Sequence, residues 1–258
     1  MILSTVNLAV GYGSRIVLEA DLSLEPGQLT VLIGSNGSGK STLLRTLAGS
    51  QTPLRGEVRL DSVPISRLSP STLAKHIAVV LTEHTGGGGL RVKELVAIGR
   101  NPYSGFFGNL SGADRKAIAG ALEMVGLKNM SERFVAELSD GERQKAMIAR
   151  AIAQQTEVII LDEPSSFLDV ASRFEIMAVL SDLAHSLGKA VLLSTHDTAA
   201  AIPVADCLWA IADGKVYAGS LGYLLDSNVL TRVFEGLEFD SLKGDFVPVT
   251  VRRAVKAP

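Results

Sequence analysis

One segment, residues 34–41 with the sequence GSNGSGKS, restricts what this chain can fold into more than any other. It matches the pattern G-x-x-x-x-G-K-[ST], in which glycines let backbone N–H groups turn inward around a phosphate. The apolar, β-branched run 29–33 predicts a buried strand before it, and residues 41–48 predict a helix after it, which Gly49 ends. A strand, a glycine loop and a helix in this order predict an α/β core whose helix N-terminus faces a bound phosphate.

The side chains of this loop are candidates for contacts with a nucleotide and its metal ion. Lys40 should reach the β- and γ-phosphates, and the hydroxyl of Ser41 should reach Mg²⁺. A glycine turn without a ligand is the alternative, but the Lys-Ser pair and both flanks argue against it. The remaining predicted nucleotide contacts of this segment are Gly34, Ser35, Asn36, Gly37, Ser38, Gly39 and Thr42.

A second apolar run, residues 158–161, ends in two acidic residues, Asp162 and Glu163. Carboxylates at the C-terminal end of a buried strand lie at the edge of an α/β sheet, where ligands bind. Asp162 is predicted to orient Mg²⁺ and its waters. Glu163 is a candidate general base for an attacking water, a role worth about 10²–10⁴ in rate. Solvated acids at a strand end are the alternative, which the phosphate loop makes less favourable.

Residues 138–145, Leu-Ser-Asp-Gly-Glu-Arg-Gln-Lys, open a helical run that continues to about Gln154. By itself, Ser139 followed three residues later by Glu142 is a capping box, an ordinary helix start. Placed between the phosphate loop and the acids, the segment resembles the L-S-G-G-Q signature of the ATP-binding subunits of ATP-binding-cassette (ABC) transporters. The resemblance runs from about residue 2 to residue 220, with the motifs in the family's order.

The resemblance implies roles for several further residues. Tyr12 stands where an aromatic side chain stacks on adenine, and His196 stands where a switch histidine acts in catalysis beside Glu163. Taken singly, they could be a hairpin aromatic and a strand-end histidine, so the common order carries the interpretation. The family works as a head-to-tail pair, which implies ATP contacts from Ser139, Gly141 and Asp169.

The chain departs from the family pattern at two places. Thr82 stands where the family has a glutamine that touches Mg²⁺, and Glu83 is the next oxygen donor. We predict that one of them supplies an oxygen near the metal, with Ser41, phosphates and waters alone as the alternative. Asp140 replaces the first signature glycine and should point outward, because a carboxylate facing the γ-phosphate would be repelled.

The fold class that we predict is α/β: a phosphate-loop NTPase core of the ABC ATPase type with an antiparallel β subdomain and an inserted helical subdomain. The antiparallel strands should come from residues 1–30 and about 55–65, with turns at 11–13, 26–27 and 55–56. Residues 1–220 should form the nucleotide-binding domain, with the helical subdomain at about 90–155. Residues 221–258 should be a short C-terminal extension.

Composition limits the partners and the location of the chain. Its 25 basic and 27 acidic residues give a net charge of −2, so no basic footprint for nucleic acid is present. The single cysteine, Cys207, excludes an internal disulfide and fits a reducing compartment. No apolar run approaches the roughly 18 residues that span a bilayer, and the N-terminus lacks the positive region of a signal peptide. We therefore expect attachment to the cytoplasmic face of the inner (plasma) membrane through a partner.

Residues 92–103, VKELVAIGRNPY, are similar to a stretch in importers of iron-siderophore, haem and cobalamin complexes. This similarity implies an ATP- and Mg²⁺-dependent subunit that pairs with a second copy and an integral membrane permease, and indirectly with a substrate-binding protein. Phe106 and Phe107 are predicted to dock on the permease, with a place in the buried core as their competing use. For the importer-like stretch itself, an amphipathic surface helix with a turn is the alternative. A non-transport ABC ATPase in a soluble complex is the competing function, and a module without hydrolysis is disfavoured by Glu163 and His196.

Overall fold

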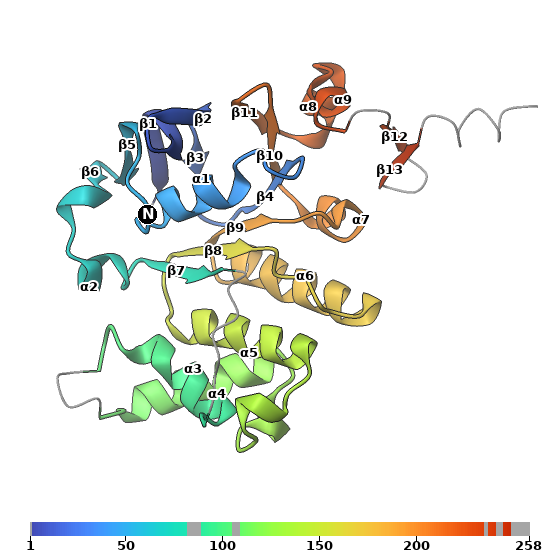
Figure 1. Ribbon diagram of the computed structural model, residues 1–258. Coiled ribbons are helices and arrows are strands. Elements are labelled where there is room, and N and C mark those ends of the chain that lie inside the picture. The colour runs from blue at the N-terminus through green and yellow to red at the C-terminus, as the bar shows by residue number, and fades with distance from the viewer. Residues whose placement is uncertain (1, 82–88, 105–108, 235–236, 241–244, 249–258) are drawn as a thin grey trace, which may run out of the picture.

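The computed structural model describes residues 2–81, 89–104, 109–234, 237–240 and 245–248. Figure 1 shows a long mixed sheet with helices on both sides and a separate helical layer. Five parallel strands form one half of the sheet, in the spatial order β10, β4, β9, β8, β7. These strands are β10 (Cys207–Ala212), β4 (Leu29–Gly34), β9 (Ala190–Ser194), β8 (Val158–Asp162) and β7 (Ile77–Val80). Every residue of β4, β8 and β9 is buried, as expected for parallel strands covered on both faces.

Antiparallel strands form the other half of the same sheet. They are β1 (Leu3–Tyr12), β2 (Arg15–Ala20), β3 (Ser23–Leu24), β5 (Arg55–Leu60), β6 (Val63–Pro64) and β11 (Lys215–Gly219). Strand β11 pairs antiparallel with β10 and parallel with β2, so the two halves are continuous. The predicted antiparallel strands are therefore present, and they continue the sheet of the nucleotide-binding core.

Two predicted turns lie differently in the structure. Strand β1 continues through Tyr12, so the first turn is at residues 13–14. The turn predicted at residues 55–56 is wrong, because these residues begin β5. Gly56 has φ 73° there, and a Cβ on it would lie 2.3 Å from the carbonyl oxygens of Val6 and Asn7. The glycine therefore permits a close approach between strands where the register of β1 and β5 shifts, not a chain reversal.

Alternate residues of the central strands bury themselves in two different cores. In β4, Leu32 packs with Leu43, Leu44 and Leu47 of α1 (Lys40–Leu47) and with the antiparallel strands. Val31 and Ile33 face the other way and belong to the core that includes α6 (Val170–His185). The sheet is thus held between α1 and α6, and the loops at its C-terminal edge are fixed from both sides.

The helical layer consists of α3 (Val92–Ala97), α4 (Gly112–Met124) and α5 (Asp140–Ala153), at the bottom of Figure 1. Helix α3 ends at Ala97 and is followed directly by one 3₁₀ turn, η2 (Ile98–Arg100). Arg100 is buried in this layer, where its Nε lies 2.7 Å from Oδ1 of Asp114 and its Nη1 donates to the carbonyl of Ala153 at 2.8 Å. Hydrogen bonds from Ser111 and the Arg100 guanidinium hold the pKa of Asp114 at about 2.

Short elements complete the described chain. The single turns are η1 (Ile65–Arg67), α2 (Pro70–Leu73), η3 (Lys128–Met130), η4 (Val135–Glu137), α7 (Thr198–Ala201) and η5 (Ile202–Val204). Beyond β11 lie α8 (Leu221–Asp226), α9 (Val229–Val233) and a hairpin of β12 (Leu237–Asp240) and β13 (Asp245–Pro248). Among the described helices, none has the length and apolar character needed to cross a bilayer.

Candidate active site

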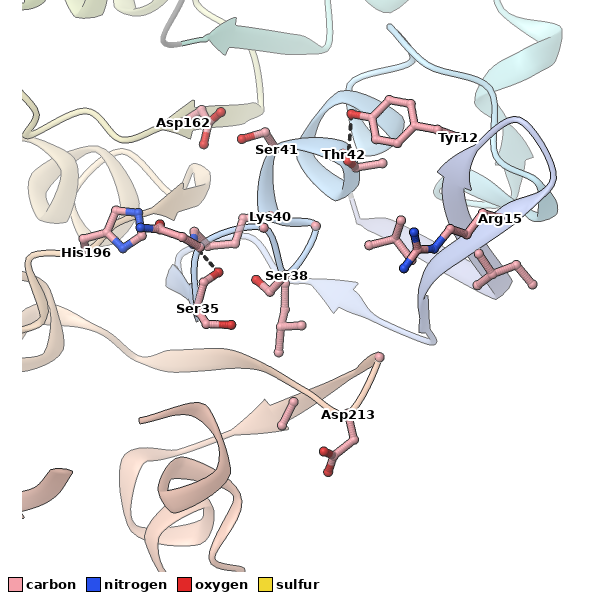
Figure 2. Close-up of a pocket in the computed structure, with 18 of the residues that line it drawn as sticks. Tyr12, Arg15, Ser35, Ser38, Lys40, Ser41, Thr42, Asp162, His196 and Asp213 are labelled. Atoms are coloured by element: carbon pink, nitrogen blue, oxygen red, sulfur yellow. Dashed lines mark hydrogen bonds between the residues drawn. The ribbon is translucent and has the colours of Figure 1, made fainter. Parts of the chain in front are cut away.

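The C-terminal ends of β4, β8 and β9 meet at one edge of the sheet and carry the predicted motifs there. A cavity of about 860 Å³ opens at this edge (Figure 2). It is lined by most of the predicted site residues, namely Tyr12, Ser35, Asn36, Gly37, Ser38, Gly39, Lys40, Ser41, Thr42, Asp162, Glu163 and His196. Residues far apart in sequence therefore share one cavity because parallel strands end at the same edge.

The phosphate loop depends on glycine at three points. Gly34 is the last residue of β4, and a Cβ there would lie 2.7 Å from Oγ of Ser38. Gly37 and Gly39 have φ values of 77° and 103°, which side chains other than glycine rarely adopt. Helix α1 starts directly after Gly39 with no side-chain cap and no acidic residue in its first turn. Its first N–H groups thus suit an anion in the cavity.

Lys40 is buried at the centre of this loop. Its Nζ donates to the carbonyl oxygens of Gly34 at 2.8 Å and Ser35 at 3.1 Å. Burial lowers the pKa of Lys40, while the nearby Glu163 and Asp162 carboxylates raise it. The loop carbonyls thus hold an ammonium group at the point where a phosphate would enter.

The two acids have different surroundings. Asp162 is 2% exposed and accepts a hydrogen bond from Oγ of Ser194 at 2.5 Å. Glu163 has Oε1 3.0 Å from Nε2 of His196, and its Oε2 accepts from the backbone N–H of His196 at 3.2 Å. Burial raises the pKa of Glu163, against the opposing effect of His196. A raised pKa brings a carboxylate closer to the strength that suits a general base near neutral pH.

Tyr12 lies at the mouth of the cavity with 58% of its surface exposed. Its hydroxyl accepts a hydrogen bond from Oγ1 of Thr42 at 3.0 Å, which ties the aromatic ring to the start of α1 (Figure 2). An exposed ring held at one end offers a flat apolar face, which suits stacking with a nucleotide base.

Four predicted ATP contacts do not line this cavity, namely Gly34 at the end of β4 and Ser139, Gly141 and Asp169 farther along the chain. Ser139 caps α5: its Oγ accepts from the N–H of Glu142 at 3.3 Å, and Oε2 of Glu142 accepts from the N–H of Ser139 at 2.8 Å, so the capping box is formed. Gly141 follows in the first turn of α5, where a Cβ would lie 3.4 Å from the carbonyl oxygen of Phe167. Asp169 caps α6 by accepting from the N–H of Ser172 at 2.9 Å. Asp140 is exposed, and its Oδ1 lies 3.2 Å from Nη1 of Arg143. Its orientation away from a γ-phosphate stays a prediction.

Four predicted residues lie outside the described parts of the chain, and eight residues that line the cavity were not predicted. Thr82, Glu83, Phe106 and Phe107 lie outside the described residues. The lining residues that sequence reasoning missed are Arg15, Ile16, Val17, Ile211, Ala212, Asp213, Gly214 and Arg232. The first three follow Tyr12 in its own hairpin, and that proximity was a usable signal. Arg232, which lies 2.8 Å from Asp213, belongs to α9 and carries no motif.

Comparisons with known proteins agree with this geometry. The model of the ABC transporter family matches residues 17–166. An uncharacterised ABC transporter ATP-binding protein of Methanocaldococcus jannaschii is 43% identical over 89% of this chain and 78% of its own length. The iron(3+)-hydroxamate import ATP-binding protein of Bacillus subtilis is 37% identical over 90% of this chain and 87% of its own.

Solved structures show the same similarity in three dimensions. A metal-chelate type ABC transporter in an inward-facing conformation has a TM-score of 0.80 and 28% identity, covering 96% of this chain and 97% of that one. A dimeric ATP-binding cassette in a post-hydrolysis state with ADP and Pi has a TM-score of 0.74 and 28% identity, covering 85% and 98%. The predicted phosphate-loop fold is confirmed, and the chain belongs to the ABC transporter family as an ATP-binding, ATP-hydrolysing member.

Proposed function

We propose that this protein hydrolyses MgATP to drive a membrane permease that imports a metal chelate, such as an iron-siderophore, haem or cobalamin complex. The observation that carries the proposal is the single cavity shared by the phosphate loop, two acids and a histidine. The import direction and the class of cargo are supported by the relatives, which include proteins named for iron(3+)-hydroxamate and ferric enterobactin transport. The second of these, from Escherichia coli, is 34% identical over 88% of this chain.

The residues of the cavity have different roles in the proposed phosphoryl transfer. Lys40 and the N–H groups of the loop bind the phosphates, and Tyr12 stacks on the base. Glu163 accepts a proton from the attacking water, and His196, within hydrogen-bond distance, holds the carboxylate in place. Gly34, Ser35, Asn36, Gly37, Ser38, Gly39 and Thr42 complete the proposed nucleotide contacts.

A magnesium ion fits the donors of this cavity. The Ser41 hydroxyl and the Asp162 carboxylate both project into it (Figure 2), and both offer oxygen, the ligand that Mg²⁺ prefers. Mg²⁺ also keeps several waters, so two side chains and the phosphates satisfy it. When bound, the ion neutralises charge on the β- and γ-phosphates. Thr82 or Glu83 is proposed as a further oxygen donor from outside the described residues.

We infer that the working unit is a head-to-tail dimer. Ser139, Gly141 and Asp169 lie away from the cavity of their own chain, which is what a site completed by a second copy requires. Ser139 begins α5, and the N-terminus of this helix favours an anion such as the γ-phosphate of a nucleotide bound to the partner. The dimeric cassette that matches this chain supports the arrangement.

The helical layer is the proposed contact with the permease. Residues 1–220 would act as the nucleotide-binding domain, with its helical subdomain at about 90–155 and the extension 221–258 beyond it. Ile98, Tyr103 and Phe134 are exposed large apolar side chains of this layer, and such groups favour a protein partner. The permease would hold the subunit on the cytoplasmic face of the membrane, with a substrate-binding protein on the far side.

The transport role is tested by isolation and by uptake. Purification of the tagged protein from membranes should recover an integral membrane permease in a fixed ratio, and growth of a deletion strain on chelated iron, haem or cobalamin should fail for one of them. Recovery of a soluble assembly instead, with normal uptake of all three, would favour a non-transport ABC ATPase.

A further inference from the structure

The last residue of β9 places a hydroxyl group between the two acids of the site. Ser194 pairs directly with Asp162 across the parallel strands β9 and β8. It is fully buried and follows the apolar residues of β9, where a hydroxyl needs a hydrogen-bond partner. Its Oγ donates to Oδ1 of Asp162 at 2.5 Å and accepts from the N–H of Glu163 at 3.1 Å. One hydroxyl therefore contacts the side chain of one acid and the backbone of the other.

The turn that carries these acids has a backbone conformation that needs support. Glu163 has φ 52°, in the left-handed region that residues other than glycine adopt only when their surroundings hold them there. Its N–H donates to both Oγ and the carbonyl oxygen of Ser194, each at 3.1 Å. The left-handed residue directs the chain so that the Asp162 and Glu163 side chains both line the cavity.

We propose that Ser194 is a positioning residue of this ATPase. Its hydroxyl holds the Asp162 carboxylate in position for Mg²⁺, and it holds the backbone of Glu163 so that the Glu163 carboxylate faces the attacking water. The inference rests on the proposed role of Asp162 in holding Mg²⁺. Groups that hydrogen-bond to a metal-binding carboxylate orient it, and their loss typically lowers metal affinity or activity about 10–100-fold. Ser194 does not itself line the cavity, so it acts through the two acids.

Neighbouring hydroxyls show that burial alone does not produce this arrangement. Thr195, the next residue, is 1% exposed, and its Oγ1 accepts from the N–H of Asp197 at 2.9 Å. It also lies 3.4 Å from Oγ of Ser165, which is likewise buried. Neither of these hydroxyls bonds to Asp162 or Glu163 in the described hydrogen bonds. Thr195→Val is therefore the matched control, because it removes a buried hydroxyl beside the site without removing a bond to either acid.

The test compares Ser194→Thr with Ser194→Val, which have the same shape and differ by the hydroxyl. Free Mn²⁺ is measured by electron paramagnetic resonance during titration of each purified dimer with a non-hydrolysable ATP analogue. Ser194→Val should weaken Mn²⁺ binding about tenfold or more, whereas Ser194→Thr and Thr195→Val should bind it within about twofold of the unaltered protein. In steady-state assays, Ser194→Val should lower kcat at saturating Mg²⁺ with little change in KM for ATP.

Each outcome of the titration decides between specific claims. Equal Mn²⁺ affinity for the Thr and Val variants, whether both normal or both weak, would overturn the role of the hydroxyl. If the larger side chain of Ser194→Val prevents folding, Ser194→Ala is used in its place. Normal Mn²⁺ binding by Ser194→Ala would also overturn the role of the hydroxyl. Asp162→Asn distinguishes failure of the proposed metal role from failure of the positioning role. If Asp162→Asn leaves Mn²⁺ binding unchanged, the proposed metal role of Asp162 fails. If Asp162→Asn binds Mn²⁺ weakly but Ser194→Val binds it normally, only the positioning role of Ser194 is refuted.

Discussion

A methyl group added at Gly99 should destabilise the helical layer strongly. Gly99 lies in η2, against the last turn of α5, and a Cβ there would lie 2.2 Å from the carbonyl oxygen of Arg150 and 3.3 Å from the backbone nitrogen of Gln154. Both neighbours are helix backbone, which cannot rotate away as a side chain can. The two elements would have to separate by about 1 Å to reach ordinary van der Waals contact. That separation would also disturb the buried ion pair of Arg100, the next residue.

The expected cost follows from this geometry. Overpacking a buried contact costs about 1–3 kcal/mol, and we expect about 3 kcal/mol because the obstacle is backbone. For a protein of this size, that lowers Tm by roughly 6–12 °C. Gly120→Ala is the matched control, since Gly120 lies within α4 and a Cβ there meets nothing within 4 Å. It should raise the free energy of unfolding by about 1 kcal/mol, as alanine replaces glycine inside a helix.

Thermal unfolding followed by circular dichroism and by tryptophan fluorescence measures both variants. The single tryptophan, Trp209, is buried in β10 and reports on the sheet, whereas circular dichroism at 222 nm also reports on the helical layer. A Gly99→Ala protein that melts with or above the Gly120→Ala protein would refute the reasoning. The close approach of η2 to α5 would then not be what requires glycine at this position.

Three further predictions concern catalysis, assembly and acid stability. Glu163→Gln should keep ATP binding and lower turnover about 10²-fold or more, and unchanged turnover would remove Glu163 from the role of general base. Ser139→Arg and Lys40→Ala homodimers should both be inactive, whereas verified mixed dimers should regain activity because one site is intact; no recovery would contradict a shared site. The depressed pKa of Asp114, about 2 against an ordinary 3.8, means that its stabilising effect is fully present above pH 3.8 and is lost as pH falls through 2. Asp114→Asn should therefore be less stable at neutral pH and lose less stability than the unaltered protein between pH 4 and pH 2 in denaturant titrations.

The parts of the site that were predictable from sequence are those encoded by local pattern. The loop 34–41 needs glycine at fixed spacing between a strand and a helix, so its position and conformation are visible in the residues themselves. The strand before Asp162 is equally local, because an apolar run ending in acids marks the edge of a buried sheet. Both predictions placed their residues in the same cavity, where the topology of parallel strands brings them together.

Features that depend on strand pairing were not predictable in the same way. The hydroxyl of Ser194 reaches Asp162 only because β8 and β9 pair in one particular register, and a register shift of one residue would turn Ser194 to the other face. Arg232 lines the cavity only because α9 packs on β10 beside the turn at Asp213. Continuity of the sheet likewise rests on one pairing between β11 and β2.

The stretch 92–103 contains residues that pack inside the helical layer and residues that are exposed on it. Its similarity to importer subunits implied a permease partner, and the contact itself stays a prediction. Within the layer, its glycine and arginine face the interior. Gly99 contacts the backbone of α5, and Arg100 is 6% exposed and bonded to Asp114 and Ala153. Arg100 also lies 4.2 Å from the ring of Tyr103, which remains 41% exposed. Gly99 and Arg100 therefore serve the packing of the layer. A docking partner would contact the side chains of this stretch that remain exposed, such as Ile98 and Tyr103. If the proposed permease docks on these side chains, the layer would pass strain from its surface to its interior, because close-packed protein interiors have low compressibility.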